Sequence, residues 1–407
     1  MDSASMQQLA ESSGEGLPGG LVAEVLAEHC ERHPGASAPR AFFAPGRVNL
    51  MGAHLDYNGG AVLPAAIDRG TIVVVSPRKD GLLRLTSSLE GGEHEFDLAR
   101  LPAERTGTWA DYPLGIARAM LSYVGAAPEG ASFHFGGNLP IGAGLSSSAS
   151  ICVGTSHSLA SIWGLELAPI DHVHIALSAE REFVGVQCGI MDPYAVGLAR
   201  ENHLLWLECR DVRYEHVPLD SERLSILVAD TGVRRDLAAS EFNQRVNECR
   251  EAFEILRPEQ PEAACLAEIS MDTLGVCAEA LGPVLGRRAA HVIAEVGRTA
   301  TAREGLRRGR PEVLGEQMME AHASLRGLYE VSCPELDRLV EAAGRCSEVF
   351  GGRLTGAGFG GACVFLVERG GEEAVSARLI ESFRASFDRD PKVAVFKAGG
   401  GPFEIAL

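Results

Sequence analysis

The 407-residue chain lacks several patterns that would place it in other classes of protein. Its ten cysteines include no CxxC pair, so the sequence predicts neither a zinc framework nor a set of disulfides, and we expect thiols in a reducing cytoplasm. No run approaches the roughly 18 apolar residues of a transmembrane helix. Residues 1–20 have neither the basic region nor the apolar run of a signal peptide, and we interpret them as a flexible tail.

Positive charge is also scarce, because 37 Lys and Arg face 55 Asp and Glu, for a net charge of −18. So acidic a chain repels phosphate backbones and anionic lipid, and we expect neither nucleic acid nor a membrane as a partner. An anionic ligand would have to be held locally, by backbone amides, a metal ion and a few placed cations. The length exceeds what one core usually supports, so two domains are expected.

What the chain does contain is three glycine-rich stretches. The first, APGRVNLMGAHLDYNGG (44–60), places the cation Arg47, the imidazole His54 and the carboxylate Asp56 between two apolar runs. Glycine lets the backbone approach a ligand closely, and crowding such polar groups together is costly for folding alone. This stretch therefore predicts a binding site.

The second stretch, LPIGAGLSSSAS (139–150), passes from glycines through serines into a helical pattern. A helix N-terminus offers unpaired N–H groups and a partial positive charge, which suits a polyphosphate, and serine oxygens suit Mg²⁺. The lysine of a Walker loop is absent, and a simple serine-capped turn remains an alternative. The third stretch, LTGAGFGGACVFLV (354–367), is by itself more typical of a tight turn than of a ligand loop.

The apolar periodicity predicts an α+β chain with segregated helices. Helices are expected at about 21–33, 109–123, 147–164, 169–184, 237–256, 261–281, 283–307, 311–331, 334–346 and 372–387. Strands are expected at 41–44, 61–67, 70–77, 82–86, 131–135, 203–208, 223–231, 348–354, 362–367 and 392–397. We place the boundary between an N-terminal domain (21–218) and a C-terminal domain (219–407) in the segment 215–222.

The motifs resemble those of the GHMP family of small-molecule kinases, and within it the galactokinase branch. GRVNLMGAHLDYNGG is similar to that branch's G-R-V-N-L-I-G-E-H-T-D-Y-N-G-G, and PIGAGLSSSAS, CGIMDPYA (188–195) and TGAGFGGA (355–362) to its phosphate loop, C-G-I-M-D-Q stretch and third motif. TWADYPLGI (108–116) and SEFNQRVNEC (240–249) resemble its W-x-N-Y-x-x-G and S-x-Y-N-x-R-R-x-E-C segments. Six matches in one order, over nearly the whole chain, argue against coincidence.

This resemblance implies a two-lobed GHMP kinase fold, with a ribosomal-S5-domain-2-like N-terminal lobe and a ferredoxin-like α/β C-terminal lobe. It implies an enzyme of carbohydrate metabolism that uses ATP and Mg²⁺ to phosphorylate the anomeric C1 hydroxyl of a galactose-configured sugar, as a monomer or weak homodimer. Asp192 aligns with the proposed general base, and Arg47 with the arginine that keeps it ionised and stabilises the transferred phosphoryl group. Without the resemblance, Arg47 and Asp192 would equally well form a structural ion pair.

Further positions follow from the same alignment. Ser148 and Glu180 match the protein ligands of Mg²⁺, although a solvated helix face is the alternative for Glu180. The residues that match nucleotide contacts are Trp109 against adenine and, at the phosphates, Gly142, Ala143, Gly144, Leu145, Ser146, Ser147 and Ser148. The residues that match sugar contacts are Arg47, Ala53, His54, Asp56, Gly189, Asp192 and Phe242.

Three of the sugar-end positions depart from the branch. Ala53 replaces a glutamate that binds the C6 hydroxyl, Phe242 a tyrosine, and Pro193 a glutamine. A C6 carboxylate about 4 Å from that glutamate would be repelled by roughly 4 kcal/mol at an effective dielectric near 20. Plant galacturonokinases also carry G-A-H here, so we slightly favour galacturonate as the substrate, with Arg234, Arg235 or Arg245 as candidate partners of its carboxylate.

Other functions remain open. Galactose is the alternative sugar, since one missing hydrogen bond costs only about 0.5–1.5 kcal/mol. Some galactokinase relatives act as transcriptional sensors of sugar and ATP, but these lose part of the serine-alanine run, which is whole here (SSSA, 146–149). A kinase for a non-sugar alcohol is disfavoured because HLDYNGG belongs to the sugar branch.

Overall fold

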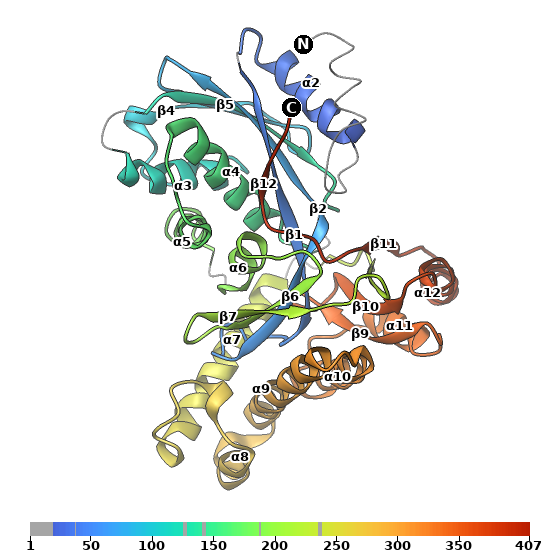
Figure 1. The fold of residues 1–407 in the computed structure, drawn as a ribbon. Coiled ribbons are helices and arrows are strands. Elements are labelled where there is room, and N and C mark those ends of the chain that lie inside the picture. Colours follow the sequence, from blue (N-terminus) through green and yellow to red (C-terminus); the bar gives the residue numbers. More distant parts are fainter. Residues whose placement is uncertain (1–18, 37, 125–127, 141–143, 187–188, 235–237) are drawn as a thin grey trace.

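The structure is a computed structural model, and it describes residues 19–36, 38–124, 128–140, 144–186, 189–234 and 238–407, without the side chains of residues 238 and 239. The expected tail 1–20 therefore lies almost wholly outside the described residues. Two β-sheets organise the rest, one built mainly from the first half of the chain and one from the second (Figure 1).

The first sheet has eight strands, with the central path β12-β1-β2-β5-β3-β4 and a β6–β7 hairpin attached to β2. All its pairs are antiparallel except β3 with β5. The strands are β1 (Arg40–Met51), β2 (Ala61–Arg78), β3 (Leu82–Ser87), β4 (His94–Asp97), β5 (Gly130–Gly137), β6 (His203–Glu208), β7 (Arg213–Pro218) and β12 (Phe403–Ile405).

Apolar side chains of β1 and β2 point alternately to the two faces of the first sheet, so both faces are covered. Phe42, Val73 and Val75 pack into the core formed with α3 and α4, whereas Phe43, Ile72 and Val74 face α2. Figure 1 shows α2 on one side of the sheet and α3 to α6 on the other. These helices are α2 (Gly19–Arg32), α3 (Asp111–Met120), α4 (Ser147–Trp163), α5 (Pro169–Ser178), the π-helical turn Ala179–Val184 and α6 (Met191–Gly197).

The second sheet is antiparallel and four-stranded, in the order β11-β8-β10-β9. Its strands are β8 (Leu224–Asp230), β9 (Val349–Thr355), β10 (Ala362–Glu368) and β11 (Lys392–Phe396). The accompanying helices are α7 (Ala238–Leu256), α8 (Met271–Val276), α9 (Ala278–Arg307), α10 (Pro311–Ser324), α11 (Pro334–Ala343) and α12 (Glu372–Phe387). A π-helical turn, Leu325–Tyr329, follows α10.

The two halves share a core. One face of β8 and β10, with Val228 and Val364, packs in the same cluster as Val48, Leu50 and Leu63 of the first sheet. The other face packs against α11 and α12. The final strand, β12, also returns to pair with β1. The domain division at 218/219 stays a prediction, and the structure adds that the last residues belong to the first sheet.

Most expected elements are present, but several boundaries differ. The strands expected at 61–67 and 70–77 form one 18-residue strand, β2, and the strand expected at 41–44 continues to Met51. Register shifts at Pro45–Arg47 let β1 pass the proline and glycine without ending. The expected helix 261–281 is wrong in its first half: Gln260 bonds the backbone of Glu268 and Ser270, which holds the residues before Ser270 out of an α-helix. Its second half is helical, because Ser270 caps α8 and α9 begins at Ala278.

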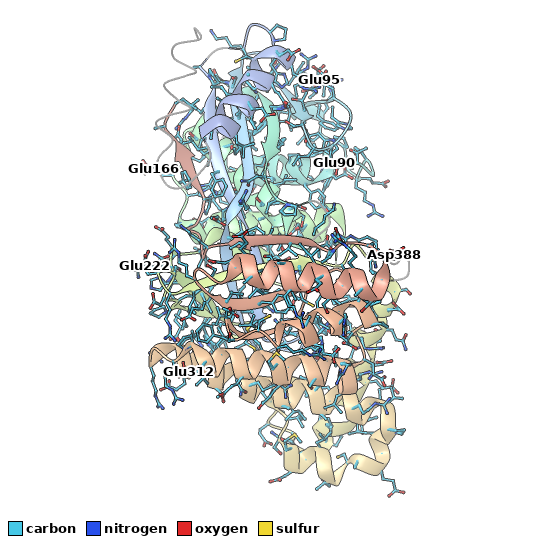
Figure 2. All side chains as sticks on the ribbon, turned by 90° about the vertical axis from the view of Figure 1, so that its right-hand side faces the viewer. Glu90, Glu95, Glu166, Glu222, Glu312 and Asp388 are labelled. Carbon is cyan, nitrogen blue, oxygen red and sulfur yellow. The ribbon has the colours of Figure 1, made fainter. Side chains whose placement is uncertain are left out.

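The negative charge is spread over both halves. Figure 2 shows Glu90, Glu95, Glu166, Glu222 and Asp388 at separate places on the molecule, and all five are exposed. Within the described residues, no helix is both long and apolar enough to cross a membrane.

Candidate functional site

Two distant motifs meet where β1 passes the start of α4. Arg47 lies on β1, and its backbone N–H donates to the carbonyl of Leu145 at 3.0 Å. The preceding Gly46 makes this approach possible, because a Cβ there would lie 2.8 Å from the same oxygen. Asp192 lies in the first turn of helix α6.

Arg47 and Asp192 form a forked ion pair. Nε of Arg47 donates to Oδ1 at 2.7 Å and Nη2 to Oδ2 at 2.7 Å, although the residues are 145 positions apart. Nη1 donates to the carbonyl of Gly144 at 2.6 Å, and the hydroxyl of Ser146 donates to Oδ2 of Asp192. The Arg47 side chain is 8% exposed and that of Asp192 27%, so the carboxylate is the open member of the pair.

The serine-rich motif opens the 17-residue helix α4 beside this pair. Gly144 (φ 70°) and Ser146 (φ 58°) are both left-handed, which turns the chain sharply into the helix at Ser147. Ser147 is exposed, Ser148 half-buried and Leu145 buried. Ser150 fixes the helix against the sheet through the carbonyl of Ala44 at 2.7 Å. The helix N-terminus therefore offers an anion site; Gly142 and Ala143 lie outside the described residues.

Glu180 lies on the π-helical turn Ala179–Val184 and is only 3% exposed. This burial excludes the solvated helix face that the sequence left open. Single π-helical turns within helices occur often at functional sites. Across the described part of the chain, no group of three or more His, Cys, Asp and Glu could by itself hold a metal ion.

The turn between β1 and β2 carries His54 in a left-handed conformation (φ 61°). Its ring is buried between aromatic side chains, with centroids 4.7 Å from Tyr329 and 6.0 Å from Phe242. Nδ1 of His54 lies 2.8 Å from the hydroxyl of Tyr57. Burial, helped by the charges of Arg353 and Arg245, lowers the pKa of His54 to about 3, so the imidazole is neutral at working pH.

Asp56, on the same turn, faces the loop that precedes Asp192. A Cβ at Gly189 would lie 1.9 Å from Oδ2 of Asp56, so only glycine allows this approach. Burial and the charge of Asp192 raise the pKa of Asp56 to about 6. The structure thus brings Asp56, Gly189, Asp192 and Arg47 together, as the sequence predicted for the sugar end.

Ala53 is buried, and a second buried carboxylate lies behind it. Oε1 of Glu295 accepts the N–H groups of Gly52 and Ala53, each at 3.2 Å, while Oε2 accepts Nε of Arg298 at 2.7 Å. Sequence reasoning missed Glu295. The signal that could have found it is an isolated charge on the apolar face of α9, between Val292 and Thr299.

The cations proposed to bind a C6 carboxylate are already engaged. Arg234 pairs with Asp230 at 2.7 Å, and Arg245 bonds Glu248 at 3.1 Å and the carbonyl of Tyr329 at 2.8 Å. Arg235 lies outside the described residues. Pro193 sits in the first turn of α6, where its missing N–H is tolerated.

Trp109 lies apart from the Arg47–Asp192 pair. Its ring is partly buried at 5.6 Å from those of His94 and Phe135, and its Nε1–H donates to the carbonyl of Gly91 at 3.2 Å. No contact found among the described residues joins it to Arg47 or Asp192.

Three family models match the chain. They are the galactokinase galactose-binding signature (residues 27–77), the GHMP kinases N-terminal domain (111–200) and the GHMP kinases C-terminal domain (302–385). Together with the sheets and the anion site already described, these matches define a small-molecule kinase: the chain belongs to the GHMP kinase family.

Within that family the chain is an ATP-dependent sugar kinase, and its relatives include many galactokinases. It is 40% identical to galactokinase of Homo sapiens over 358 residues (85% of this chain, 89% of that protein). It is 37% identical to that of Chloroflexus aurantiacus over 371 residues (91% and 95%). The crystal structure of Lactococcus lactis galactokinase complexed with galactose matches with a TM-score of 0.88 at 30% identity, covering 94% of this chain and 99% of that one.

Proposed function

We propose that this enzyme transfers the γ-phosphoryl group of ATP to the anomeric C1 hydroxyl of galactose. The observation that carries the proposal is the forked Arg47–Asp192 pair beside the N-terminus of α4. Phosphoryl transfer needs an acceptor held in line with a polyphosphate and charge stabilisation around it. This arrangement provides both, one from each of two motifs.

Asp192, Arg47 and Ser146 have separate roles in this proposed transfer. Asp192, whose carboxylate is the open member of the pair, accepts the hydrogen bond of the C1 hydroxyl and takes its proton late in the reaction. Arg47 fixes the orientation of that carboxylate through two bonds, and its remaining Nη1–H is available to the transferred phosphoryl oxygens. Ser146 holds Oδ2 from the other side.

Ser148 and Glu180 would hold Mg²⁺. A hydroxyl and a carboxylate oxygen are the donors that this ion prefers, and Mg²⁺ on a nucleotide commonly takes only one or two protein ligands beside phosphates and water. The burial of Glu180 on its π-helical turn fits a ligand better than a surface charge. The bound ion would neutralise charge on the β- and γ-phosphates. Trp109, partly buried and ringed by aromatic contacts, would stack against adenine.

At the sugar end, we assign galactose rather than galacturonate. The relatives reported above are galactokinases, and the galacturonate expectation finds no support from them. The described candidate cations, Arg234 and Arg245, are committed to Asp230 and Glu248. A C6 carboxylate would therefore compete with existing ion pairs, whereas a C6 hydroxyl needs no charge partner. Galacturonate remains the second candidate, because Ala53 removes the carboxylate that would repel it.

Steady-state kinetics with galactose, galacturonate, N-acetylgalactosamine and arabinose test this assignment. We expect galactose to have the highest kcat/KM by at least about tenfold, which corresponds to roughly 1.4 kcal/mol. Ala53→Glu should raise the preference for galactose over galacturonate further. Ala53→Gln can accept a hydrogen bond from the C6 hydroxyl but carries no charge, so it separates the effect of that hydrogen bond from the repulsion of a C6 carboxylate. A higher kcat/KM for galacturonate would overturn the assignment, and no shift in either variant would show that position 53 does not read C6.

We also place the enzyme in the cytoplasm, as a monomer or weak homodimer. No described cysteine forms a disulfide, which suits a reducing compartment. Analytical ultracentrifugation at micromolar concentration tests the oligomeric state: a stable dimer or larger assembly would contradict it.

A further inference from the structure

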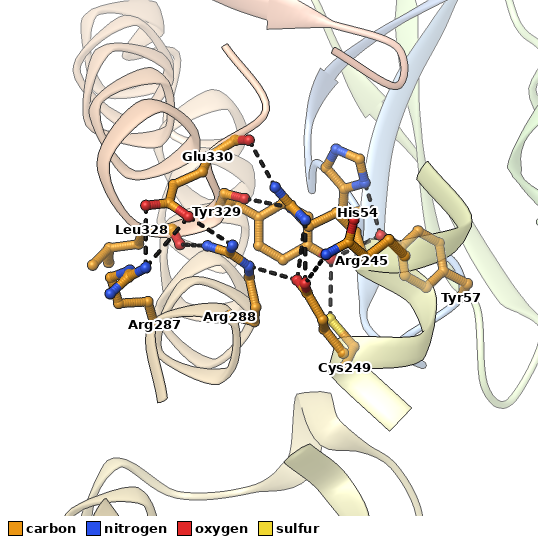
Figure 3. Close-up of polar contacts among 11 residues, drawn as sticks. His54, Tyr57, Arg245, Cys249, Arg287, Arg288, Leu328, Tyr329 and Glu330 are labelled. Carbon is orange, nitrogen blue, oxygen red and sulfur yellow. Dashed lines mark hydrogen bonds and ion pairs between the residues drawn. The ribbon is translucent and has the colours of Figure 1, made fainter. Parts of the chain in front are cut away.

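A chain of hydrogen bonds runs from the C-terminal half into the sugar motif (Figure 3). Sγ of Cys249, on α7, lies 3.0 Å from the hydroxyl of Tyr329. That hydroxyl lies 2.8 Å from the hydroxyl of Tyr57, which lies 2.8 Å from Nδ1 of His54. Cys249 and Tyr329 are at most 1% exposed. Nε2 of His54 is buried without a partner among the described residues, and Figure 3 shows this nitrogen turned away from the chain.

Three contacts join four groups, so the hydrogens can be counted. Burial raises the pKa of Cys249 to about 11 and the pKa values of Tyr57 and Tyr329 well above their ordinary range, so each keeps its one hydrogen at neutral pH. His54 is neutral and brings one N–H. Each contact needs one hydrogen, so one of the four is spare. A spare hydrogen on Tyr57 or Tyr329 would need an acceptor outside the chain, and the described residues give these two hydroxyls none. All donors therefore point the same way along the chain. They point either toward His54 or toward Cys249.

Chemistry favours the direction toward His54. A phenol is a good donor and an imidazole nitrogen a good acceptor, whereas sulfur is a weak acceptor at which to end a chain. The side chain of Asn58 is a further neighbour of this sulfur. The same Asn58 amide donates to the carbonyl of His54 at 2.7 Å. In the direction toward His54, Cys249 donates to Tyr329 at the far end of the chain.

We propose that Cys249, Tyr329 and Tyr57 are positioning residues that hold His54 in the tautomer with its proton on Nε2. In this form His54 presents an N–H donor, and the oxygen that it binds is an acceptor on the sugar. The sugar contact rests on the proposed function, but the tautomer itself does not. The opposite tautomer would offer a bare nitrogen, which could only accept from a sugar hydroxyl.

Two arginines fix the backbone around this chain of hydrogen bonds. Nε of Arg245 holds the carbonyl of Tyr329 at 2.8 Å, and Nη1 of Arg288 holds the carbonyl of Leu328 at 2.6 Å. Both arginines bond the same carboxylate, Glu248, one residue before Cys249 (Figure 3). The π-helical turn Leu325–Tyr329 and helix α7 are therefore tied together at the point where the thiol meets the phenol.

The direct test is nitrogen NMR of the sugar-free protein labelled with ¹⁵N-histidine, with His54 assigned by its loss in His54→Gln. We expect Nε2 of His54 at the shift of a protonated ring nitrogen and Nδ1 at that of a bare one. Tyr57→Phe removes the donor to Nδ1 and should abolish this preference, and Cys249→Ser should retain it because a hydroxyl also donates. Cys277→Ala, a buried cysteine outside the chain, is the matched control and should leave the His54 signals unchanged.

Kinetics provide the second readout. In Tyr57→Phe the KM for sugar should rise about three- to tenfold while the KM for ATP stays constant, the range expected for one neutral hydrogen bond. Cys249→Ala should show a smaller rise, and Cys249→Ser should restore the wild-type value. Protonated Nδ1 in the wild type would overturn the proposal, as would an unchanged tautomer in Tyr57→Phe. Failure of galactose as substrate with the expected tautomer present would instead reject only the proposed function.

Discussion

Two buried arginines, one in each sheet, have different roles in the molecule. Arg47 on β1 pairs with a carboxylate that is 27% exposed. Arg353 on β9 is 1% exposed and meets only carbonyls, donating to Leu50 at 2.6 Å, Asn49 at 2.8 Å and Leu354 at 2.8 Å. Two of those carbonyls belong to β1, two and three positions beyond Arg47. The same type of side chain therefore orients the carboxylate of the proposed general base in one place and joins the two halves of the fold in the other.

The difference lies in what each partner can do without the arginine. Asp192 can be reached by water, so loss of Arg47 removes orientation but leaves no stranded charge. The carbonyls around Arg353 are enclosed, so its loss leaves buried acceptors unsatisfied. Burial also lowers the pKa of Arg353 to about 10, a sign that this charge is kept at some expense. An arginine whose partner is open to solvent can take part in chemistry, and one enclosed by buried carbonyls stabilises the fold.

The largest effect is expected for Arg47→Met. Because the fork that orients Asp192 is lost, kcat/KM should fall about a thousandfold, the loss typical of removing one group that stabilises the transition state. The free energy of unfolding should change by only about 1 kcal/mol. Arg47→Lys keeps the charge without the fork, so its kcat/KM should lie between those of the wild type and Arg47→Met. A variant Arg47→Met that retained a tenth of wild-type kcat/KM would remove Arg47 from the mechanism.

Arg353→Met should have the opposite effects, a large loss of stability and little loss of activity. We expect the free energy of unfolding to fall by about 3 kcal/mol, because three buried carbonyl bonds are lost, with kcat/KM of the folded enzyme within a fewfold of wild type. Urea denaturation measures the free energy of unfolding. Assays at a temperature well below the unfolding midpoint measure kcat/KM. Arg345→Met, on an exposed pair, is the control and should change stability by less than about 0.5 kcal/mol. Wild-type stability with lost activity would place Arg353 in the site instead.

The smallest effect concerns Asp56 and pH. Burial and Asp192 raise the pKa of Asp56 to about 6, so this carboxylate gains a proton as the pH falls through that value and becomes a much weaker acceptor for a sugar hydroxyl. The kcat/KM for sugar should therefore fall about tenfold between pH 7 and pH 5. Stability should move the other way: because the folded pKa is raised, ionising Asp56 destabilises the fold between about pH 4 and pH 6, and the loss is complete above that.

Asp56→Asn is the matched variant for this profile. Its kcat/KM should be lower at every pH but flat between pH 5 and pH 7. A wild-type profile with no inflection near pH 6, or a variant that keeps the inflection, would assign the titration to another group.

Local signals in the sequence were enough to predict that Arg47 and Asp192 lie together. The motif around Arg47 and the stretch around Asp192 each carried a recognisable pattern, and the structure brings the two side chains together. Helix α12 and strand β6 lie at the predicted residues, since their periodic patterns are clear and their ends are marked. The roles of Arg47, Asp192, Ser148 and Glu180 stay predictions that the experiments above address.

The misses that matter most at the site are contacts between residues far apart in the sequence. Nothing near Arg353 in the sequence indicates that it reaches a carbonyl 303 positions away. Glu295 looked like one charged residue in a long helix until its carboxylate was seen against the amides of Gly52 and Ala53. Tyr329 lies on a π-helical turn that periodicity predicts as ordinary helix. Such contacts are decided by packing between halves, which a single sequence does not reveal.

The pairing of β12 with β1 has a consequence for how the protein is made. The edge of β1 that this strand covers, Ala41–Phe43, is synthesised long before its partner, Phe403–Ile405. Until β12 has been made, the nascent polypeptide must keep that edge from pairing with the edge of a neighbouring chain. A stop codon before residue 403 would therefore leave this edge of β1 unpaired and prone to aggregation, although the change lies far from β1 in the sequence.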